Sequence, residues 1–385
     1  MSTPANILIS AIGHEVFGTP FAIDGRPDEA CLKSAVRLAR AQDLAHLAAP
    51  DLLPLASGLS DPSVADALRT AHTQALYRYA HFCGATEAIR AVFNRRGIPF
   101  ILLKGAVLRS YYPEAWMRTS CDIDVLVHPE DLEAASQALT GDAGYSREYS
   151  TSHDVTFISD ENVHVELHHM VLEDGRANRS AEVLAEMWEH THPVSGSEAA
   201  LDDDMFYFYH VAHMAKHFES GGCGVRYVLD LHLLARRSAG NRAGIDTLLG
   251  RAGLSDFDRV MRELAAVWFD GSAGTEVTNR ASSFVLSGSA HGSIENHVSI
   301  ERGAKRGGKL GLVLRSVFLP YSRLSIKYPI LKKHKWLTPV CTVVRWFDVL
   351  FHRRKRAMSV LARNASVGSE EIGNADRLLQ DVGLR

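Results

Sequence analysis

The sequence predicts an α+β protein in which a small mixed β-sheet core is flanked by N- and C-terminal helical modules. The first observation is helical periodicity, since apolar residues recur every three or four positions over 29–49, 63–96 and 202–237. The second is a group of short apolar or alternating runs, typical of strands, between about 97 and 171. A length of 385 residues suits two or three modules of this kind.

The composition is that of an ordinary globular protein. Hydrophobic residues make up 46%, charged residues 23%, and the net charge of −3 excludes a chain-wide polyanion binder. The five cysteines are odd in number and include no C-x-x-C pair, which argues against a disulfide framework or a thiolate zinc site. The N-terminus has no basic leader and no uncharged apolar run approaches about 18 residues, so we expect a cytoplasmic protein without a transmembrane segment.

Changes in residue pattern divide the chain into four predicted regions: an N-terminal helical region over 1–96, a core over 97–195, a helical domain over 196–300 and a basic helical C-terminal region over 301–385. In the first region, a Pro/Gly/Ser-rich segment over 50–63 separates helices over 29–49 and 63–96. In the last region, the residues from Asn364 onward are polar, and we expect them to be mobile.

The core begins with a strand, a tight turn at Lys104-Gly105 and a helical segment that Pro113 ends. A glycine in such a turn lets the backbone approach a phosphate group. The helix that follows offers unpaired N–H groups and a positive dipole end. Lys104 itself is interpreted in two ways, as a phosphate ligand or as a solvated residue at a strand end.

Two aspartates interrupt the next strand, "DIDVLV". Side chains alternate along a strand, so Asp122 and Asp124 share one face with Leu126 while the intervening apolar residues form the other face. Two carboxylates this close repel each other unless a cation lies between them, and a divalent metal is the usual solution. After a helix that starts at Pro129, a predicted hairpin over 153–171 places Glu166 on the polar face of its second strand.

In the helical domain the sequence predicts two helices separated at Gly221-Gly222, with further helices to about Ser287. On the first helix the histidines at 210, 213 and 217 fall near one face, and Lys216 lies beside them. On the second, Arg226 and Asp230 are spaced as an i, i+4 ion pair. These residues are interpreted either as a helix–helix interface with a surface ion pair or as groups that close over a nucleotide.

The segment "FILLKGAVLRSYYPEAWMRTSCDIDVLVHPEDLEAA", with the later "VHVELHH", resembles the uncharacterised bacterial nucleotidyltransferase family of the DNA polymerase beta-like superfamily. The blocks "FYHVAHMAKHF", "VRYVLDL", "YPIL" and "WLTPV" extend the resemblance over most of the chain. In one departure, the superfamily's common Gly-Ser after the first strand is Lys-Gly-Ala here.

The resemblance implies a polymerase beta-like core and a metal-dependent enzyme. It implies that Asp122, Asp124 and Glu166 bind two Mg²⁺ ions, or Mn²⁺, and carry catalysis. It also implies a nucleotide-binding set, with ATP or another NTP as substrate, formed by Lys104, Gly105, Arg118, His213, Lys216, His217 and Asp230. The nucleoside monophosphate would pass to an unidentified acceptor, a sugar, small metabolite, peptide, protein side chain or RNA end, with release of pyrophosphate.

Other interpretations stay open. The chain can be an inactive nucleotide- or partner-binding module of the same fold. It can also be a metal-dependent hydrolase that uses the face of His164, Glu166 and His168, which could bind zinc. His213 and His217, spaced i, i+4 on a helix, are a second possible zinc pair. His168 alternatively orients a neighbouring acid or packs in the sheet, and Arg118 neutralises phosphate or pairs with a surface acid.

The C-terminal region is basic, since Asp348 is its only acid between 303 and 357. Two interpretations fit it: contact with an anionic surface, either lipid or nucleic acid, or helical packing with a solvated basic end. In the first, the aromatic and basic groups come from Trp336, Trp346, Phe351 and Arg353 to Arg356.

Overall fold

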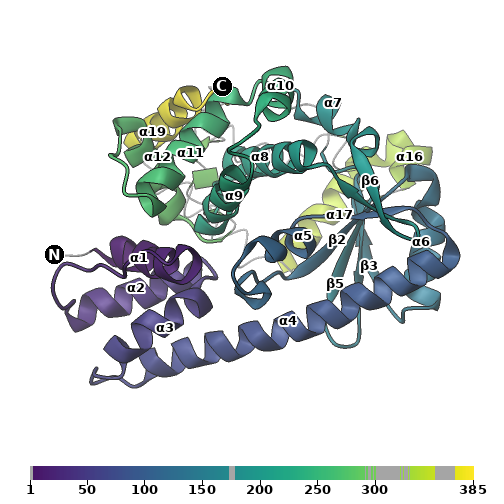
Figure 1. Ribbon diagram of the computed structural model, residues 1–385. Helices are drawn as coiled ribbons and strands as arrows, with labels where there is room; N and C mark the ends of the chain where they lie inside the picture. The colour runs from purple at the N-terminus through teal and green to yellow at the C-terminus, as the bar shows by residue number, and fades with distance from the viewer. Residues whose placement is uncertain are drawn as a thin grey trace.

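A computed structural model describes residues 3–172, 178–290, 330–351 and 369–385, together with a few positions between 292 and 328 (Figure 1). Its centre is a seven-stranded sheet with the order β3-β4-β5-β2-β1-β7-β6. The strands are β1 Phe100–Leu102, β2 Asp122–Val127, β3 Ser146–Ser150, β4 Asp154–Ile158, β5 His164–His168, β6 Thr191–Ser195 and β7 Glu198–Leu201.

The sheet is mixed, as predicted. Strand β2 pairs antiparallel with β1 and parallel with β5, and β4 and β5 form the predicted antiparallel hairpin. Strands β3, β6 and β7 were not predicted. The edge strand β3, "SREYS", is exposed throughout and lacks apolar alternation, and the edge strand β6, "THPVS", contains a proline. Proline is tolerated in β6 because this strand lies at the edge of the sheet.

The two faces of the sheet belong to different hydrophobic clusters, as the alternation of β2 predicts. Ile123 and Val125 pack with Phe93 of α4 (Ser63–Arg96) and Leu139 of α6 (Leu132–Gly141). Leu126, on the opposite face, belongs to the larger cluster formed with the other helices. Figure 1 shows α4 running along one side of the sheet, with α8 and α9 on the other side.

The N-terminal region forms α1 (Pro4–Phe17), α2 (Glu29–Ala41) and α3 (Ala45–Ala56) before α4. The prediction of a non-helical segment from residue 50 was wrong in its first part, because α3 continues through Pro50 and Pro54. Packing overrides the cost of these prolines, since most of the apolar side chains of α3 are buried in the larger cluster.

The predicted pair of helices after the sheet is confirmed. Helix α8 (Asp203–Ser220) and helix α9 (Val225–Arg237) are separated by Gly221 and Gly222, both of which have positive φ. The remaining helices are α5 Gly105–Leu108, α7 Ser180–Leu184, α10 Ala243–Ala252, α11 Ser255–Phe269, α12 Glu276–Ser287, α16 Ile330–Lys333, α17 Thr338–Phe351 and α19 Ser369–Asp381. Among the residues that the structure describes, no helix is long and apolar enough to cross a membrane.

The expected mobile end was wrong for residues 369–385. Helix α19 packs on α12, and Leu378, Leu379 and Val382 are buried in the larger cluster because they form an apolar face. Residues 364–368 and Arg353 to Arg356 lie outside the described residues. The division into four regions stays a prediction, and the larger cluster joins residues of the N-terminal helices with residues of α8 to α12.

Candidate functional site

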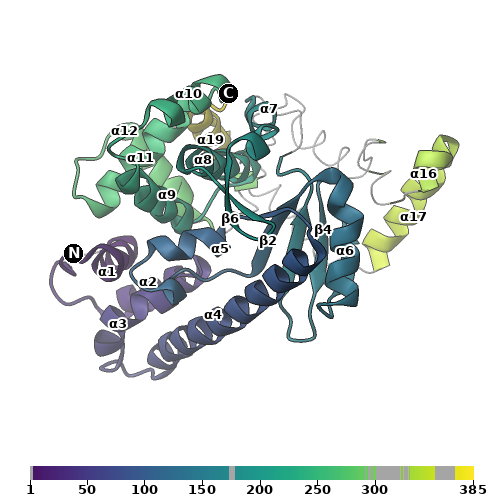
Figure 2. The same ribbon diagram turned by 45° about the vertical axis from the view of Figure 1, so that its right-hand side comes forward.

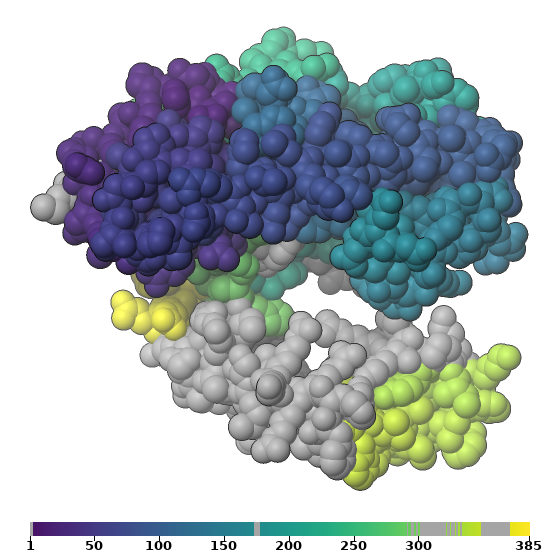
Figure 3. All heavy atoms as spheres, turned by 90° about the horizontal axis from the view of Figure 1, so that it is seen from below, coloured from purple at the N-terminus to yellow at the C-terminus, as the bar shows by residue number. Residues whose placement is uncertain are grey.

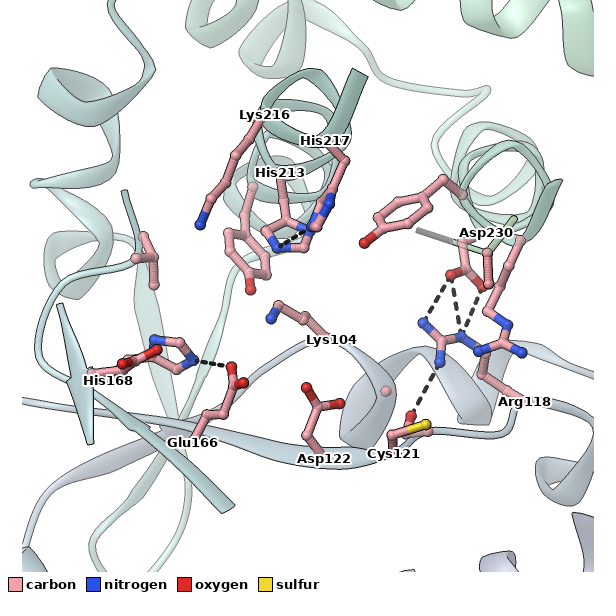
Figure 4. Close-up of a pocket in the computed structure, with 18 of the residues that line it drawn as sticks. Lys104, Arg118, Cys121, Asp122, Glu166, His168, His213, Lys216, His217 and Asp230 are labelled. Atoms are coloured by element: carbon pink, nitrogen blue, oxygen red, sulfur yellow. Dashed lines mark hydrogen bonds and ion pairs between the residues drawn. The ribbon is translucent and has the colours of Figure 1, made fainter. Parts of the chain in front are cut away.

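A cavity of about 410 Å³ lies between the larger-cluster face of the sheet and helices α8 and α9. Figure 4 shows Asp122 and Glu166 on its sheet side, with His213, Lys216 and His217 opposite. Nine of the ten predicted site residues line it, namely Lys104, Gly105, Arg118, Asp122, Glu166, His213, Lys216, His217 and Asp230. The tenth, Asp124, lies behind this lining with 1% of its surface exposed.

The three predicted carboxylates come together because β2 and β5 are parallel neighbours. The register places Asp124 directly beside Glu166. Asp122, two residues earlier on β2, shares their face. Repulsion from Asp124, together with burial, raises the pKa of Asp122 to about 6. The site therefore holds negative charge that its own residues do not fully balance.

Lys104 lies against the acids. Its ammonium Nζ donates a hydrogen bond to Oδ1 of Asp124 at 2.6 Å. Burial works against the charged amine, but the Asp124 carboxylate holds the pKa of Lys104 well above its usual value. The same contact, against the cost of burial, holds the pKa of Asp124 well below its usual range. Lys104 is thus not a free lysine at a strand end, because it is paired with Asp124 as the internal counterion of the acid cluster.

The turn at 104–105 differs from its sequence-based description in two respects. Positive φ, +44°, occurs at Lys104, whereas Gly105 is the first residue of α5. Glycine is required at 105 by space, because a Cβ there would lie 1.8 Å from Oγ of Ser120. Helix α5 is a single turn whose N–H groups at 106, 107 and 108 already bond to carbonyls of Leu103 and Lys104, so the expected helix-dipole site is not formed.

His168 connects two of the acids. Its Nε2 lies 2.9 Å from Oδ1 of Asp124 and 3.4 Å from Oε2 of Glu166. Burial opposes a charged ring, but these hydrogen bonds raise the pKa of His168. The prediction that His168 orients a neighbouring acid is confirmed. His164 instead lies 3.5 Å from Glu148, so the alternative set of His164, Glu166 and His168 does not converge.

Asp230 pairs with Arg118 rather than with Arg226. The expected i, i+4 pair was wrong, because Asp230 is buried and its carboxylate faces the sheet domain, where Arg118 donates from Nη2 at 3.0 Å. Tyr112 donates to the same carboxylate at 2.6 Å. Arg226 donates to Asp43 at 2.7 Å. These contacts fix α9 to the segment that precedes β2 and to the turn between α2 and α3.

The α8 side of the cavity carries two of the three predicted histidines, His213 and His217, whereas Nε2 of His210 lies 3.0 Å from the carbonyl oxygen of Tyr227. Nε2 of His213 lies 3.3 Å from Nε2 of His217, and burial lowers the pKa of His213 well below its usual value. Sequence reasoning missed Asp43, Ser120, Tyr209 and Tyr227, which also line the cavity. The tyrosines occupy ordinary apolar helix positions and Asp43 lies far from the core in sequence, so no local signal identified them.

The donors at the acid cluster suit a divalent cation. Ligand atoms of Asp124, Glu166 and His168 lie within 4.8 Å of one another, and Asp122 adds a further carboxylate. Carboxylate oxygens are the protein ligands that Mg²⁺ and Mn²⁺ prefer. The raised pKa of Asp122 shows that added positive charge would relieve repulsion here.

A family model described as "Uncharacterised nucleotidyltransferase" matches residues 29–270. The matched range contains the whole sheet and every residue discussed above at the acid cluster. No curated protein and no solved structure matches the chain.

Replacing each of the two aspartates by asparagine should change the stability of the metal-free protein in opposite directions. Asp122 binds a proton more readily in the folded than in the unfolded state, so its ionisation between about pH 4 and pH 6 lowers stability. Asp122→Asn should therefore raise the free energy of unfolding at pH 7 by about 1–3 kcal/mol, and have little effect at pH 4. Asp124→Asn should lower it by about 3 kcal/mol, because Lys104 loses its partner. Denaturant unfolding measures both, and equal effects would contradict this charge arrangement.

Gly105→Ala should destabilise the protein by about 1–3 kcal/mol, because the new methyl group overlaps Ser120. Adding Ser120→Gly should recover most of that loss relative to Ser120→Gly alone. Gly84→Ala is the matched control, since a Cβ at this position in α4 meets nothing within 4 Å. Thermal unfolding of the four variants measures whether the effects of Gly105→Ala and Ser120→Gly are coupled. Additive effects would show that contact with Ser120 is not the reason for a glycine at position 105.

Proposed function

The chain belongs to the family of uncharacterised nucleotidyltransferases, and we propose that it moves a nucleoside monophosphate from an NTP to an acceptor hydroxyl. The acceptor oxygen bonds to the α-phosphorus, the bond to the bridging oxygen of the leaving group breaks, and pyrophosphate is released. The observation that carries this proposal is the convergence of Asp122, Asp124 and Glu166 at one cavity with cationic groups around it.

Asp122, Asp124 and Glu166 would hold the divalent cations, two Mg²⁺ or alternatively Mn²⁺. When bound, such cations neutralise phosphate charge and activate the attacking oxygen. Their ligand oxygens and the unbalanced charge at Asp122 support this assignment.

Glu166 is the proposed proton acceptor for the attacking hydroxyl. It lies at the cavity surface, whereas Asp124 is buried behind it, so an acceptor reaches Glu166 first. His168 holds the Glu166 and Asp124 carboxylates from the same strand, β5. This leaves the Glu166 side chain at the cavity surface, held in place by His168.

The nucleotide is proposed to bind between the acid cluster and α8. Lys104, Gly105, Lys216, His213 and His217 line the space that the triphosphate would occupy. Lys104 and Lys216 supply positive charge, and the buried neutral His213 supplies a ring nitrogen as a hydrogen-bond group.

Arg118 also borders this space, and its guanidinium orientation is fixed by Asp230. In this proposal Asp230 acts on the nucleotide through Arg118, since the carboxylate is buried and already accepts three donor contacts.

Glu166→Gln separates this enzyme from an inactive binding module. Nucleotide binding should largely survive, because Asp122 and Asp124 remain, while turnover should fall about 10²–10⁴-fold as the proton acceptor is lost. Glu161→Gln, on the exposed turn of the same hairpin, is the control. Calorimetry with Mg²⁺ and an NTP measures binding, and pyrophosphate release in a cell extract that supplies acceptors measures turnover. Equal release by wild type and Glu166→Gln would reject the three-carboxylate site.

Incubation with each α-labelled NTP, Mg²⁺ and cell extract tests the reaction class. The wild-type protein should transfer label to an acceptor, and Asp122→Asn should abolish this transfer. Stoichiometric tightly bound zinc in the purified protein, with NTP hydrolysis and no labelled acceptor, would instead support the hydrolase interpretation.

A further inference from the structure

The C-terminal helix α17 exposes a continuous apolar stripe. Val340, Val343, Val344 and Phe347 recur at three- and four-residue spacing, and Trp336 precedes them in register. Their exposed fractions run from 43% at Val343 to 74% at Trp336. Exposed large apolar residues arranged this way mark a surface that binds something.

The stripe is not the inner face of the helix. Cys341 of α17 and Leu337, which precedes the helix, instead pack in a small separate cluster with Leu324, Leu331 and Tyr328. Figures 2 and 3 show α16 and α17 apart from the sheet and from the helices around the cavity. Helix α17 therefore packs in a small cluster of its own and lies apart from the cavity.

The charge of this part of the chain identifies the kind of partner. Between Gly303 and Ala357 there are 14 Lys and Arg residues and one acid, Asp348. The exposed Lys333 and Lys335 immediately precede the stripe. An aliphatic stripe within so basic a stretch of sequence is typical of a helix that lies in the headgroup layer of an anionic membrane.

Other partners match these features less well. Nucleic acid would use the basic groups but gives no burial to valine side chains, because base contacts rely on aromatic stacking and hydrogen bonds. A second copy would pair two segments that are both strongly basic in sequence, which charge repulsion disfavours. Anionic lipid satisfies both the charge and the apolar side chains.

We propose that α17, with Trp336, docks this protein on an anionic lipid surface and lies along it. The valines and Phe347 enter the boundary between headgroups and acyl chains, while the flanking lysines contact lipid phosphates and carboxylates. This inference stands independently of nucleotidyl transfer, since it uses no residue of the cavity.

Vesicle flotation of the full chain tests the proposal. With vesicles of phosphatidylcholine containing about one-third phosphatidylserine we expect binding that weakens in high salt, and little binding to phosphatidylcholine alone. Val340→Ser/Val343→Ser/Phe347→Ser should reduce binding about tenfold or more, because the inserted apolar area is lost. Val194→Ser is the matched control, since Val194 on β6 is as exposed as Val340, 54% each, and should bind like wild type.

A charge variant tests the electrostatic contribution to the proposed lipid binding. Lys333→Glu/Lys335→Glu should also weaken binding and reduce its salt dependence, and circular dichroism of both variants should match wild type because all five positions are exposed. Absence of vesicle binding, equal binding to neutral vesicles, or wild-type binding by the triple variant would overturn the proposal. Light scattering that shows a dimer lost in the triple variant would assign the stripe to a second copy, and binding to duplex DNA or RNA that the triple variant retains would assign the basic region to nucleic acid.

Discussion

The ion pair between Lys104 and Asp124 is the interaction on which the candidate site depends. It joins the turn after β1 to the centre of β2, and His168 extends it to β5. Without this ammonium group, three carboxylates would face one another with little to balance them, and a buried Asp124 would carry a large desolvation cost. The unusual backbone of Lys104, with positive φ, is tolerated because it directs the side chain to that carboxylate. In the proposed reaction, the metal cations compete with Lys104 for the Asp124 carboxylate, and the triphosphate competes with Asp124 for the Lys104 ammonium group.

The second wall of the cavity depends on contacts between distant parts of the chain. Arg118 and Tyr112, beside the sheet, bind Asp230 of α9, and Arg226 binds Asp43 between α2 and α3. These buried or half-buried pairs hold three regions together around one cavity. Removing one member leaves its partner buried without compensation, so the arrangement is specific even where its net stabilisation is small. The helical regions therefore supply residues that form and hold one wall of the cavity.

The sequence predicted the features that follow from local periodicity. Alternation along β2 and β5 placed Asp122, Asp124 and Glu166 on one face, and the parallel register of the two strands brought them together. Long-range contacts could not be predicted. Arg226, the i, i+4 neighbour of Asp230, binds Asp43 instead, and Asp230 binds Arg118, which lies 112 residues away in the sequence. Helix α3 continues through two prolines because most of its apolar side chains are buried, and the polar strand β3 forms because it pairs with β4. Each failure reflects tertiary packing that overrides a local preference.

The most direct test of the account is a crystal structure of the protein with Mn²⁺ and a non-hydrolysable NTP analogue. Anomalous scattering should locate Mn²⁺ on oxygens of Asp122, Asp124 and Glu166, with the triphosphate between them and α8 and with the Lys104 ammonium moved from Asp124 toward a phosphate oxygen. An analogue bound elsewhere, or Mn²⁺ absent from these carboxylates while Lys104 keeps its contact with Asp124, would contradict it.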